Sequence, residues 1–192
     1  MERIKKDLLA SAELKKIVAE TLSGEIYKAV QLIKESLANG GKLLLMGNGG
    51  SASDAQHIAA ELVGRFKKER KALPAIALTA NTSTLTAIGN DYEYASIFSR
   101  QVEAFARKGD AVLGISTSGN SENVVRALKR ANELGAATIG LFGNEGGKAK
   151  DCVQVAIVVP SKDTARIQEA HIAIGHVICE ILEQDLTREN KI

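Results

Sequence analysis

Short apolar runs alternate with helical patterns along most of this chain, and this alternation constrains the fold more than any other feature of the sequence. Five runs have the length and composition of buried strands: KLLLMG, PAIALT, AVLGIS, ATIGLF and VQVAIVV. Helical patterns such as ASDAQHIAAELVGRF and ENVVRALKRANELG separate most of them. Strands joined by helices run parallel in a sheet that is covered on both faces. We therefore predict an α/β fold, a three-layer sandwich with a five-stranded parallel sheet flanked by helices.

A helical pattern precedes the first strand. Apolar residues recur there at three- and four-residue spacing, and the pattern stops at Asn39-Gly40-Gly41; they are Ile26, Val30, Ile33 and Leu37. We expect residues 1–40 to form an N-terminal helical segment that packs on the same domain, and residues 41–192 to form the main part of a single globular domain.

The last segment, from about Asp163 to Leu186, reads as one long helix with apolar residues on more than one side. A helix that is apolar nearly all round must be covered by other protein. In so small a domain, another subunit is a good candidate for that cover.

Composition narrows the class of protein. The 25 Lys and Arg nearly balance the 23 Asp and Glu, and the basic run KKERK at 67–71 is interrupted by an acid and lacks aromatic neighbours. We interpret that run as a solvated surface rather than a nucleic-acid site. No stretch approaches 18 apolar residues, and the first residues lack a hydrophobic core, so we expect no membrane span, no signal peptide and a cytoplasmic protein. Cys152 and Cys179 stand alone in apolar surroundings, which is typical of buried thiols in a reducing compartment.

Two loops after predicted strands carry ligand-binding chemistry. In an open parallel sheet, ligands bind beyond the carboxyl ends of the strands. The stretch GNGGS at 47–51 offers glycines for close backbone approach, and we expect Ser51 or Ser53 to cap the next helix. The stretch ISTSGNS at 115–121 offers hydroxyls and backbone N–H groups before a helix, which suits a phosphate monoester. The alternative is an ordinary turn whose last Ser caps that helix.

Two pairs of helical residues could form a metal site. His57 and Glu61 are four residues apart, about 40° around a helix axis, and Gln168 and His176 are eight apart, about 80°. Each pair alone is more often a surface contact or a neighbour of the core. Together they offer two imidazoles, a carboxylate and an amide oxygen, a plausible zinc ligand set although Gln is an uncommon ligand. His171 lies about 140° from His176, so we interpret it as structural.

Five stretches resemble in order the bacterial phosphoheptose isomerases of the sugar isomerase (SIS) domain superfamily: GNGGSASDAQHIAAELVGRF, PAIALT, LTAIGNDY, GDAVLGISTSGNSENV and RIQEAHIAIGH. The resemblance runs from about residue 42 to residue 185. It implies a SIS-domain, flavodoxin-like sandwich, a homotetramer, and conversion of sedoheptulose 7-phosphate to D-glycero-D-manno-heptose 7-phosphate for lipopolysaccharide or surface-heptose synthesis.

The resemblance also implies which residues act. It places a zinc ion (Zn2+) on His57, Glu61, Gln168 and His176. It places the sugar phosphate on a longer set, with Glu61 and Gln168 also touching substrate: Asn48, Gly49, Gly50, Asn90, Asp91, Ser116, Thr117, Ser118 and Ser121. Asp163 is given no role.

The chemistry follows from residue types. An aldose–ketose isomerisation needs a base, an acid and an electrophile to pass through an enediol. Glu61 is the best candidate for the base and His176 for the acid, with a metal polarising the carbonyl. A metal-bound carboxylate is a poorer base, and the sequence leaves that tension open.

Two other functions stay open. Some SIS-domain proteins are not enzymes and bind partners such as the replication initiator DnaA; the presence of both Glu61 and His176 favours the enzyme. A sugar-phosphate-sensing transcription regulator would need an added helix-turn-helix and a basic face, and neither is evident.

Overall fold

The computed structural model describes residues 1–189, and its centre is a five-stranded sheet in the order β2-β1-β3-β4-β5. All neighbouring strands are parallel. The strands coincide with the five predicted runs: β1 (Leu43–Gly47), β2 (Ala75–Ala77), β3 (Ala111–Ser116), β4 (Ala137–Phe142) and β5 (Val155–Val158). The predicted sheet is therefore confirmed, and its order is that of a doubly wound, flavodoxin-like fold.

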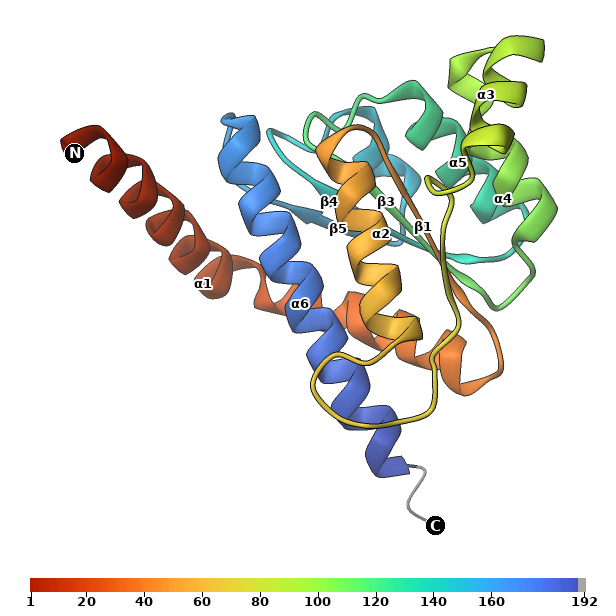
Figure 1. Cartoon of the computed structure of the whole chain (residues 1–192), viewed down its shortest axis with the longest axis horizontal. Coiled ribbons are helices and arrows are strands. Elements are labelled where there is room, and N and C mark those ends of the chain that lie inside the picture. The colour runs from red at the N-terminus through yellow and green to blue at the C-terminus, as the bar shows by residue number, and fades with distance from the viewer. Residues whose placement is uncertain (190–192) are drawn as a thin grey trace.

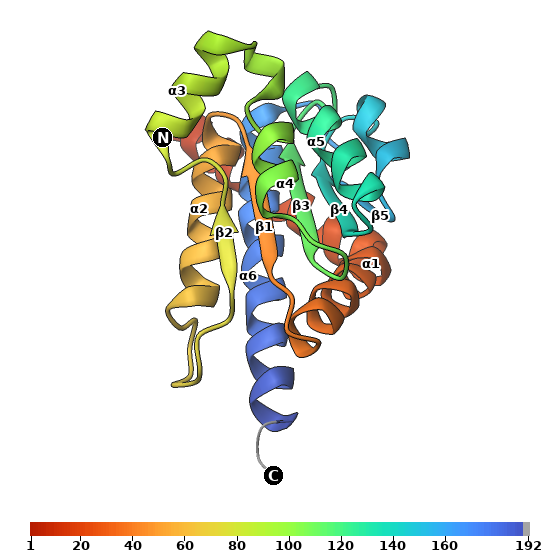
Figure 2. The same ribbon diagram turned by 90° about the vertical axis from the view of Figure 1, so that its right-hand side faces the viewer.

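Helices cover both faces of the sheet, as Figures 1 and 2 show. The long helices α1 (Glu2–Ala38), α2 (Gly50–Val63) and α6 (Thr164–Glu189) share one apolar core, and α4 (Ser99–Phe105) and α5 (Glu122–Glu133) line the other. The short helix α3 (Thr82–Asp91) and the 3₁₀ turns Tyr94–Ser96 and Gly147–Cys152 complete the second layer.

Alternation along the central strands explains the two cores. In β1, Leu43 and Leu45 belong to the core beneath α1, α2 and α6, whereas Leu44 and Met46 belong to the core beneath α4 and α5. Successive side chains of a strand point to opposite faces, so a strand buried on both faces is apolar throughout. For this reason the five strand sequences are continuously apolar and do not alternate between apolar and polar residues.

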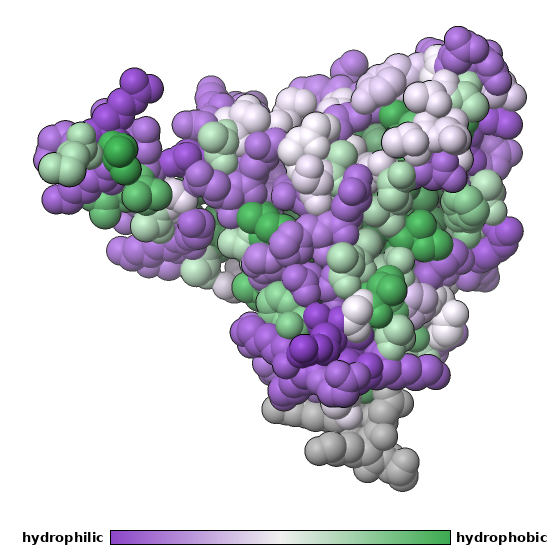
Figure 3. All heavy atoms as spheres, in the orientation of Figure 1, coloured by the Kyte–Doolittle hydropathy of each residue, from purple (hydrophilic) through white to green (hydrophobic). Residues whose placement is uncertain are grey.

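The helix α1 is one continuous element, and only part of it packs on the domain. Ile26, Val30 and Ile33 are buried against the sheet layer, but residues 1–10 are all exposed. The N-terminal end projects away from the body of the molecule (Figure 1) and carries an apolar surface (Figure 3). Its exposed apolar side chains are Met1, Ile4, Leu8 and Leu9.

The helix α6 is mostly, but not fully, covered within the chain. It lies between α1 and α2, and its apolar residues from Ile167 to Leu186 belong mostly to the first core. The helix α1 supplies part of the cover, but Val177 stays 45% exposed, so the expectation that another subunit covers α6 stays a prediction. The end of α1 carries further exposed apolar side chains.

Two surface expectations also need correction. Cys179 is buried, and burial raises the pKa of its thiol to about 12, but Cys152 is only half-buried; both are free thiols. In the run at 67–71, Arg70 is not on a solvated face: its side chain is 4% exposed and pairs with Glu183. Among residues 1–189, no helix is long and apolar enough to cross a membrane.

Candidate active site

The two predicted ligand loops lie side by side at the switch point of the sheet. The strands β1 and β3 are neighbours, and the chain leaves them toward opposite layers, into α2 and α5. A crevice for ligands opens beyond the carboxyl ends of strands at such a point. The stretches GNGGS and ISTSGNS thus meet at one place, as the sequence predicted.

A pair of amides joins these loops. The side chains of Asn48, after β1, and Asn123, in the first turn of α5, exchange two hydrogen bonds of 2.9 and 3.0 Å. The hydroxyl of Tyr94 donates to the same Asn48 oxygen at 2.9 Å. The position of the first loop is therefore set by contacts from two distant segments of the chain.

The second loop is held in shape by its own side chains. The hydroxyls of Ser116 and Ser121 lie 3.0 Å apart, and the backbone N–H of Gly119 donates to Ser116 Oγ at 3.1 Å. Gly119 has φ +66°, and a Cβ there would come within 1.9 Å of the Gly146 carbonyl oxygen, so only glycine fits.

Ser121 occupies the N-cap position of α5 but, within the described chain, makes no side-chain cap hydrogen bond. The alternative that this loop is only a turn closed by a capping Ser loses its main support. The first N–H groups of α5 and two hydroxyls are directed to the same end of the helix, which suits an anion.

The start of α2 differs from the prediction. Gly49, with φ +54°, is the N-cap residue and the helix begins at Gly50, so Ser51 and Ser53 lie inside the helix and the expected serine cap was wrong. A cap residue with positive φ favours glycine. The first N–H groups of α2 are again left without a side-chain cap among the described residues.

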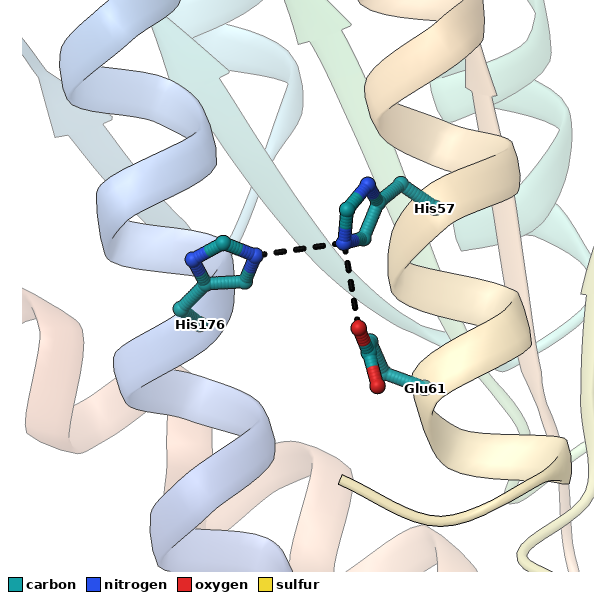
Figure 4. Close-up of side chains that lie close together, drawn as sticks. All are labelled: His57, Glu61 and His176. Carbon is teal, nitrogen blue, oxygen red and sulfur yellow. Dashed lines mark hydrogen bonds and ion pairs between the residues drawn. The ribbon is translucent and has the colours of Figure 1, made fainter. Parts of the chain in front are cut away.

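Three ionisable side chains converge between α2 and α6 (Figure 4). His57 Nε2 lies 3.1 Å from Glu61 Oε1 and 3.2 Å from His176 Nε2. One ligand atom from each residue lies within 4.8 Å of the others. Two residues of this group are half-buried and His57 is more exposed, so the cluster is open to solvent. The predicted His57–Glu61 and His176 neighbourhood is thus present.

The geometry fits a cation. In a tetrahedral zinc site with bonds of about 2.0–2.1 Å, neighbouring ligand atoms lie about 3.3 Å apart. The two measured separations from His57 Nε2 match that spacing. Two imidazole nitrogens that face each other can share at most one ring proton, whereas both can ligate one metal ion. These three residues therefore form a suitable donor set.

Close helix packing brings the cluster together. Gly175 precedes His176, and a Cβ on it would lie 2.7 Å from Ile58 Cδ1. Ile58 follows His57, so the missing Cβ lets α6 approach α2 where the imidazoles meet. Nearer the helix starts, a Cβ on Gly50 would lie 2.5 Å from Gln168 Nε2. Gln168 therefore lies on the first ligand loop; its role as a ligand stays a prediction.

Two more ionisable groups lie on the helices that carry the cluster, Asp54 on α2 and His171 on α6. Burial raises the pKa of Asp54 to about 6 against the opposing effect of His57. Its Oδ2 atom is buried and has no hydrogen-bond partner among the described residues. His171, five residues before His176, faces the sheet, where its Nε2 lies 3.0 Å from the Phe142 carbonyl oxygen. Burial lowers the pKa of His171 to about 4, so it is a neutral core residue, as expected.

Other predicted residues are placed but not tested. Asn90 and Asp91 end α3, are exposed, and share a hydrogen bond of 2.9 Å. Thr117 and Ser118 lie in the second loop, and the Thr117 carbonyl accepts from Asn144 at 2.9 Å. Asp163 accepts from the backbone N–H of Ala165 at 2.9 Å and so caps α6.

Sequence reasoning missed three neighbours of the site. Asn123, which is buried, is the second residue after the Ser-rich loop, and its place in the first turn of the predicted helix was a usable signal. Tyr94 reaches Asn48 across 46 residues. The ring of Phe66 lies 5.6 Å from that of His176, and only the fold brings them together.

Comparisons with known proteins identify the family to which this fold belongs. Residues 9–143 match the model of the SIS domain family. A curated phosphoheptose isomerase from Geotalea daltonii is 55% identical over 191 residues, covering 100% of each chain.

Two solved structures are similar throughout. The phosphoheptose isomerase GmhA from Neisseria gonorrhoeae has a TM-score of 0.91 and 44% identity, covering 95% of this chain and 98% of that one. A phosphoheptose isomerase from Francisella tularensis has a TM-score of 0.92 and 39% identity, covering 95% and 97%.

Proposed function

The chain belongs to the phosphoheptose isomerase family of SIS-domain proteins, and we propose that it converts sedoheptulose 7-phosphate to D-glycero-D-manno-heptose 7-phosphate. It is an aldose–ketose isomerase that acts on a sugar phosphate. The observation that carries the proposal is the convergence of Glu61 and His176 from two helices, beside a pair of loops suited to a phosphate.

The spacing of the two regions supports a long substrate. His57 lies seven residues after Gly50 on α2, about 10 Å along the helix axis. In a heptulose 7-phosphate, the phosphate and the C1–C2 bond are at opposite ends of the molecule. The loops would hold the phosphate while the cluster meets the carbons that react, so remote binding would orient the reacting end.

The proposed steps use two residues of the chain. Glu61 removes a proton from C1 of the ketose while His176 gives a proton to the C2 oxygen, which yields the enediol. Glu61 then returns its proton to C2, and His176 takes the proton from the C1 oxygen, which leaves the aldose and restores both residues. His57 holds Glu61 through their 3.1 Å contact.

We propose zinc as the ion of this site, held by His57, Glu61 and His176 with Gln168 as a fourth ligand. When bound, the ion would polarise the sugar carbonyl and stabilise the negative charge that develops on its oxygen. For His57, Glu61 and His176, support comes from the donor chemistry and from the ligand-atom spacing; Gln168, which lies against Gly50, is proposed from the family resemblance alone.

A coupled assay on sedoheptulose 7-phosphate tests the function. Purified protein should form the heptose 7-phosphate, and removal of metal by a chelator should abolish turnover until zinc is restored. Absence of turnover with zinc present would overturn the proposal. It would favour the alternative, a SIS-domain protein that binds DnaA or another protein partner.

We also propose a homotetramer in the cytoplasm that supplies heptose precursors for lipopolysaccharide or surface glycans, with no nucleic acid or membrane as partner. The projecting end of α1 supports the assembly, because Ile4, Leu8 and Leu9 are 66%, 66% and 58% exposed. Apolar surface of that kind marks interaction sites. Light scattering should give four chains per particle, and Leu8→Glu should yield smaller species; a wild-type monomer would contradict this.

A further inference from the structure

A buried ion pair lies near the C-terminal end of α2, next to the cluster and away from the two loops. Glu183 of α6 is seven residues after His176, and its side chain is 2% exposed. Arg70 Nε lies 3.2 Å from Glu183 Oε2, and the Arg70 side chain is 4% exposed. The proposed reaction uses neither residue. Burying both charges is costly unless each is fully paired, so their contacts indicate what the pair does.

Glu183 holds the segment that follows α2. Its carboxylate accepts from the backbone N–H groups of Phe66, Lys67 and Lys68 at 2.9, 2.9 and 2.8 Å. Burial raises the pKa of this carboxyl, but the three amides and Arg70 outweigh it, so its pKa lies below the usual value. The charged carboxylate therefore fixes three successive residues of the segment to α6.

Arg70 holds the end of α2 itself. Its guanidinium donates to the carbonyl oxygens of Glu61 at 2.9 Å and Leu62 at 2.8 Å. These carbonyls belong to the last turn of α2, where a helix lacks partners of its own and favours a positive charge. The contact to Glu61 is made to the backbone of the residue that we propose as the base.

The segment fixed in this way brings an aromatic ring to the cluster. Phe66 is the first of the three residues that Glu183 holds, and its ring lies 5.6 Å from that of His176. The pair thus acts on both proposed catalytic residues, on Glu61 through Arg70 and on His176 through Phe66.

We propose that Glu183, with Arg70, is a positioning residue of the active site: it sets the end of α2 against α6 so that Glu61 and His176 face one substrate. The inference rests on the proposed function. A contact of ordinary packing would hold two helices together, but the ion pair with its directed hydrogen bonds also fixes their relative rotation and the place of Phe66.

Glu183→Gln and Phe66→Leu test the proposal, with Glu180→Gln as the matched control. Glu180 lies on the same helix and pairs with Lys67 at 2.8 Å, but at the surface. For Glu183→Gln, kcat should fall about tenfold or more, because small displacements of reacting groups have large effects, while KM should change less than about twofold, because the loops lie at the other end of α2. Phe66→Leu should lower kcat in the same way.

The ring-proton NMR resonances of His176 give a readout that does not depend on activity. The chain has three histidines, so His176→Asn assigns the signal in metal-free protein. Both test variants should shift it, because each removes or displaces the Phe66 ring, and Glu180→Gln should not. If Glu183→Gln does not fold, the kcat and the His176 resonances of Phe66→Leu test the proposal instead.

The proposal is overturned if the folded test variants keep the wild-type kcat and the wild-type His176 resonances, even if Glu183→Gln melts at a lower temperature. That result would make the pair purely structural. If the wild-type protein does not isomerise the sugar phosphate, the proposed function fails by itself, and the His176 resonances still decide whether Glu183 sets the cluster.

Discussion

The loops at the strand ends and the cluster between α2 and α6 use opposite chemistry. The loops are held by neutral groups, with Ser116 against Ser121 and Asn48 against Asn123. The cluster consists of groups that can change protonation state. Neutral donors bind an anion without exchanging protons with it, and ionisable groups can move a proton. The comparison teaches that the proposed binding and the proposed chemistry would rely on different kinds of group at different positions along α2, so substitutions should separate KM from kcat.

The largest expected effect comes from the cluster. Glu61→Gln and His176→Asn should each fold and bind the sugar phosphate, yet lose at least about 100-fold in kcat, as expected when a general acid or base is removed. Zinc content should fall in both variants and in His57→Ala, because each removes a proposed ligand.

Steady-state kinetics and elemental analysis measure these losses. Glu69→Gln is the control, since the Glu69 side chain is 92% exposed. Full activity in both Glu61→Gln and His176→Asn would contradict the proposal that the cluster carries out the catalysis. Activity that is lost only with the metal would assign them to coordination alone.

Substitutions in the loop should act on binding. Ser116→Ala or Ser121→Ala removes one of two hydroxyls that lie 3.0 Å apart, and each lost donor to a charged ligand costs about 1–3 kcal/mol. KM should rise about tenfold while kcat stays within about twofold. Ser99→Ala, on α4, is the control. If neither loop variant changes KM, the loop is only a turn, and the proposal that the loops bind the phosphate while the cluster does the chemistry is wrong.

A smaller effect should follow from spreading α2 and α6. Gly175→Ala places a Cβ about 2.7 Å from Ile58 Cδ1, so either the Ile58 side chain shifts or the helices separate where His57 meets His176, and we expect the close packing to favour separation. We expect kcat to fall severalfold with little change in KM. Gly24→Ala in α1 is the matched control, because nothing lies within 4 Å of its new Cβ. Equal kinetics in the two variants would show that the spacing tolerates this shift.

The smallest effect on catalysis is expected at His171, which shares a helix with His176 but lies in the core. Its pKa in the folded protein is about 4, against about 6.5 when unfolded, because of burial. The unfolded chain therefore binds the proton more readily, so stability is complete above about pH 6.5 and falls as pH drops toward 4, by on the order of 3 kcal/mol.

His171→Gln should remove this loss and leave kcat near the wild-type value. Urea unfolding of the two proteins between pH 7 and pH 4 measures the difference in slope. The raised pKa of Asp54 acts in the opposite direction and is common to both proteins, so it cancels in the comparison. Identical slopes would contradict the assignment of His171 as a neutral core residue.

Local patterns predicted the strands and the two loops, because a strand buried on both faces is a continuous apolar run and a Ser-rich turn is a continuous run of small polar residues. The helix α3 was not predicted, because none of its residues is buried and its sequence therefore has no apolar period. The start of α2 was misjudged because Gly49 adopts a positive φ that a serine cap cannot use.

Long-range contacts could not be predicted from the sequence. Glu183 meets the N–H of Phe66 across 117 residues, and neither position has a local pattern that pairs them. His57 and His176 were grouped from their types, and the 3.2 Å between their Nε2 atoms depends on Gly175, whose role appears only when two helices are packed. Asp163, to which the sequence assigned no role, acts as a helix cap.

The pairing of α1 with α6 joins the first helix to the last. During synthesis at about 5–20 residues per second, α1 would leave the ribosome on the order of ten seconds before α6 is complete. Until then its apolar face, which includes Val30 and Ile33, lacks the last helix that the folded chain packs against it. The order of translation therefore leaves α1 without its last partner during most of synthesis, and a ribosome-bound chain halted before α6 should expose it to proteases.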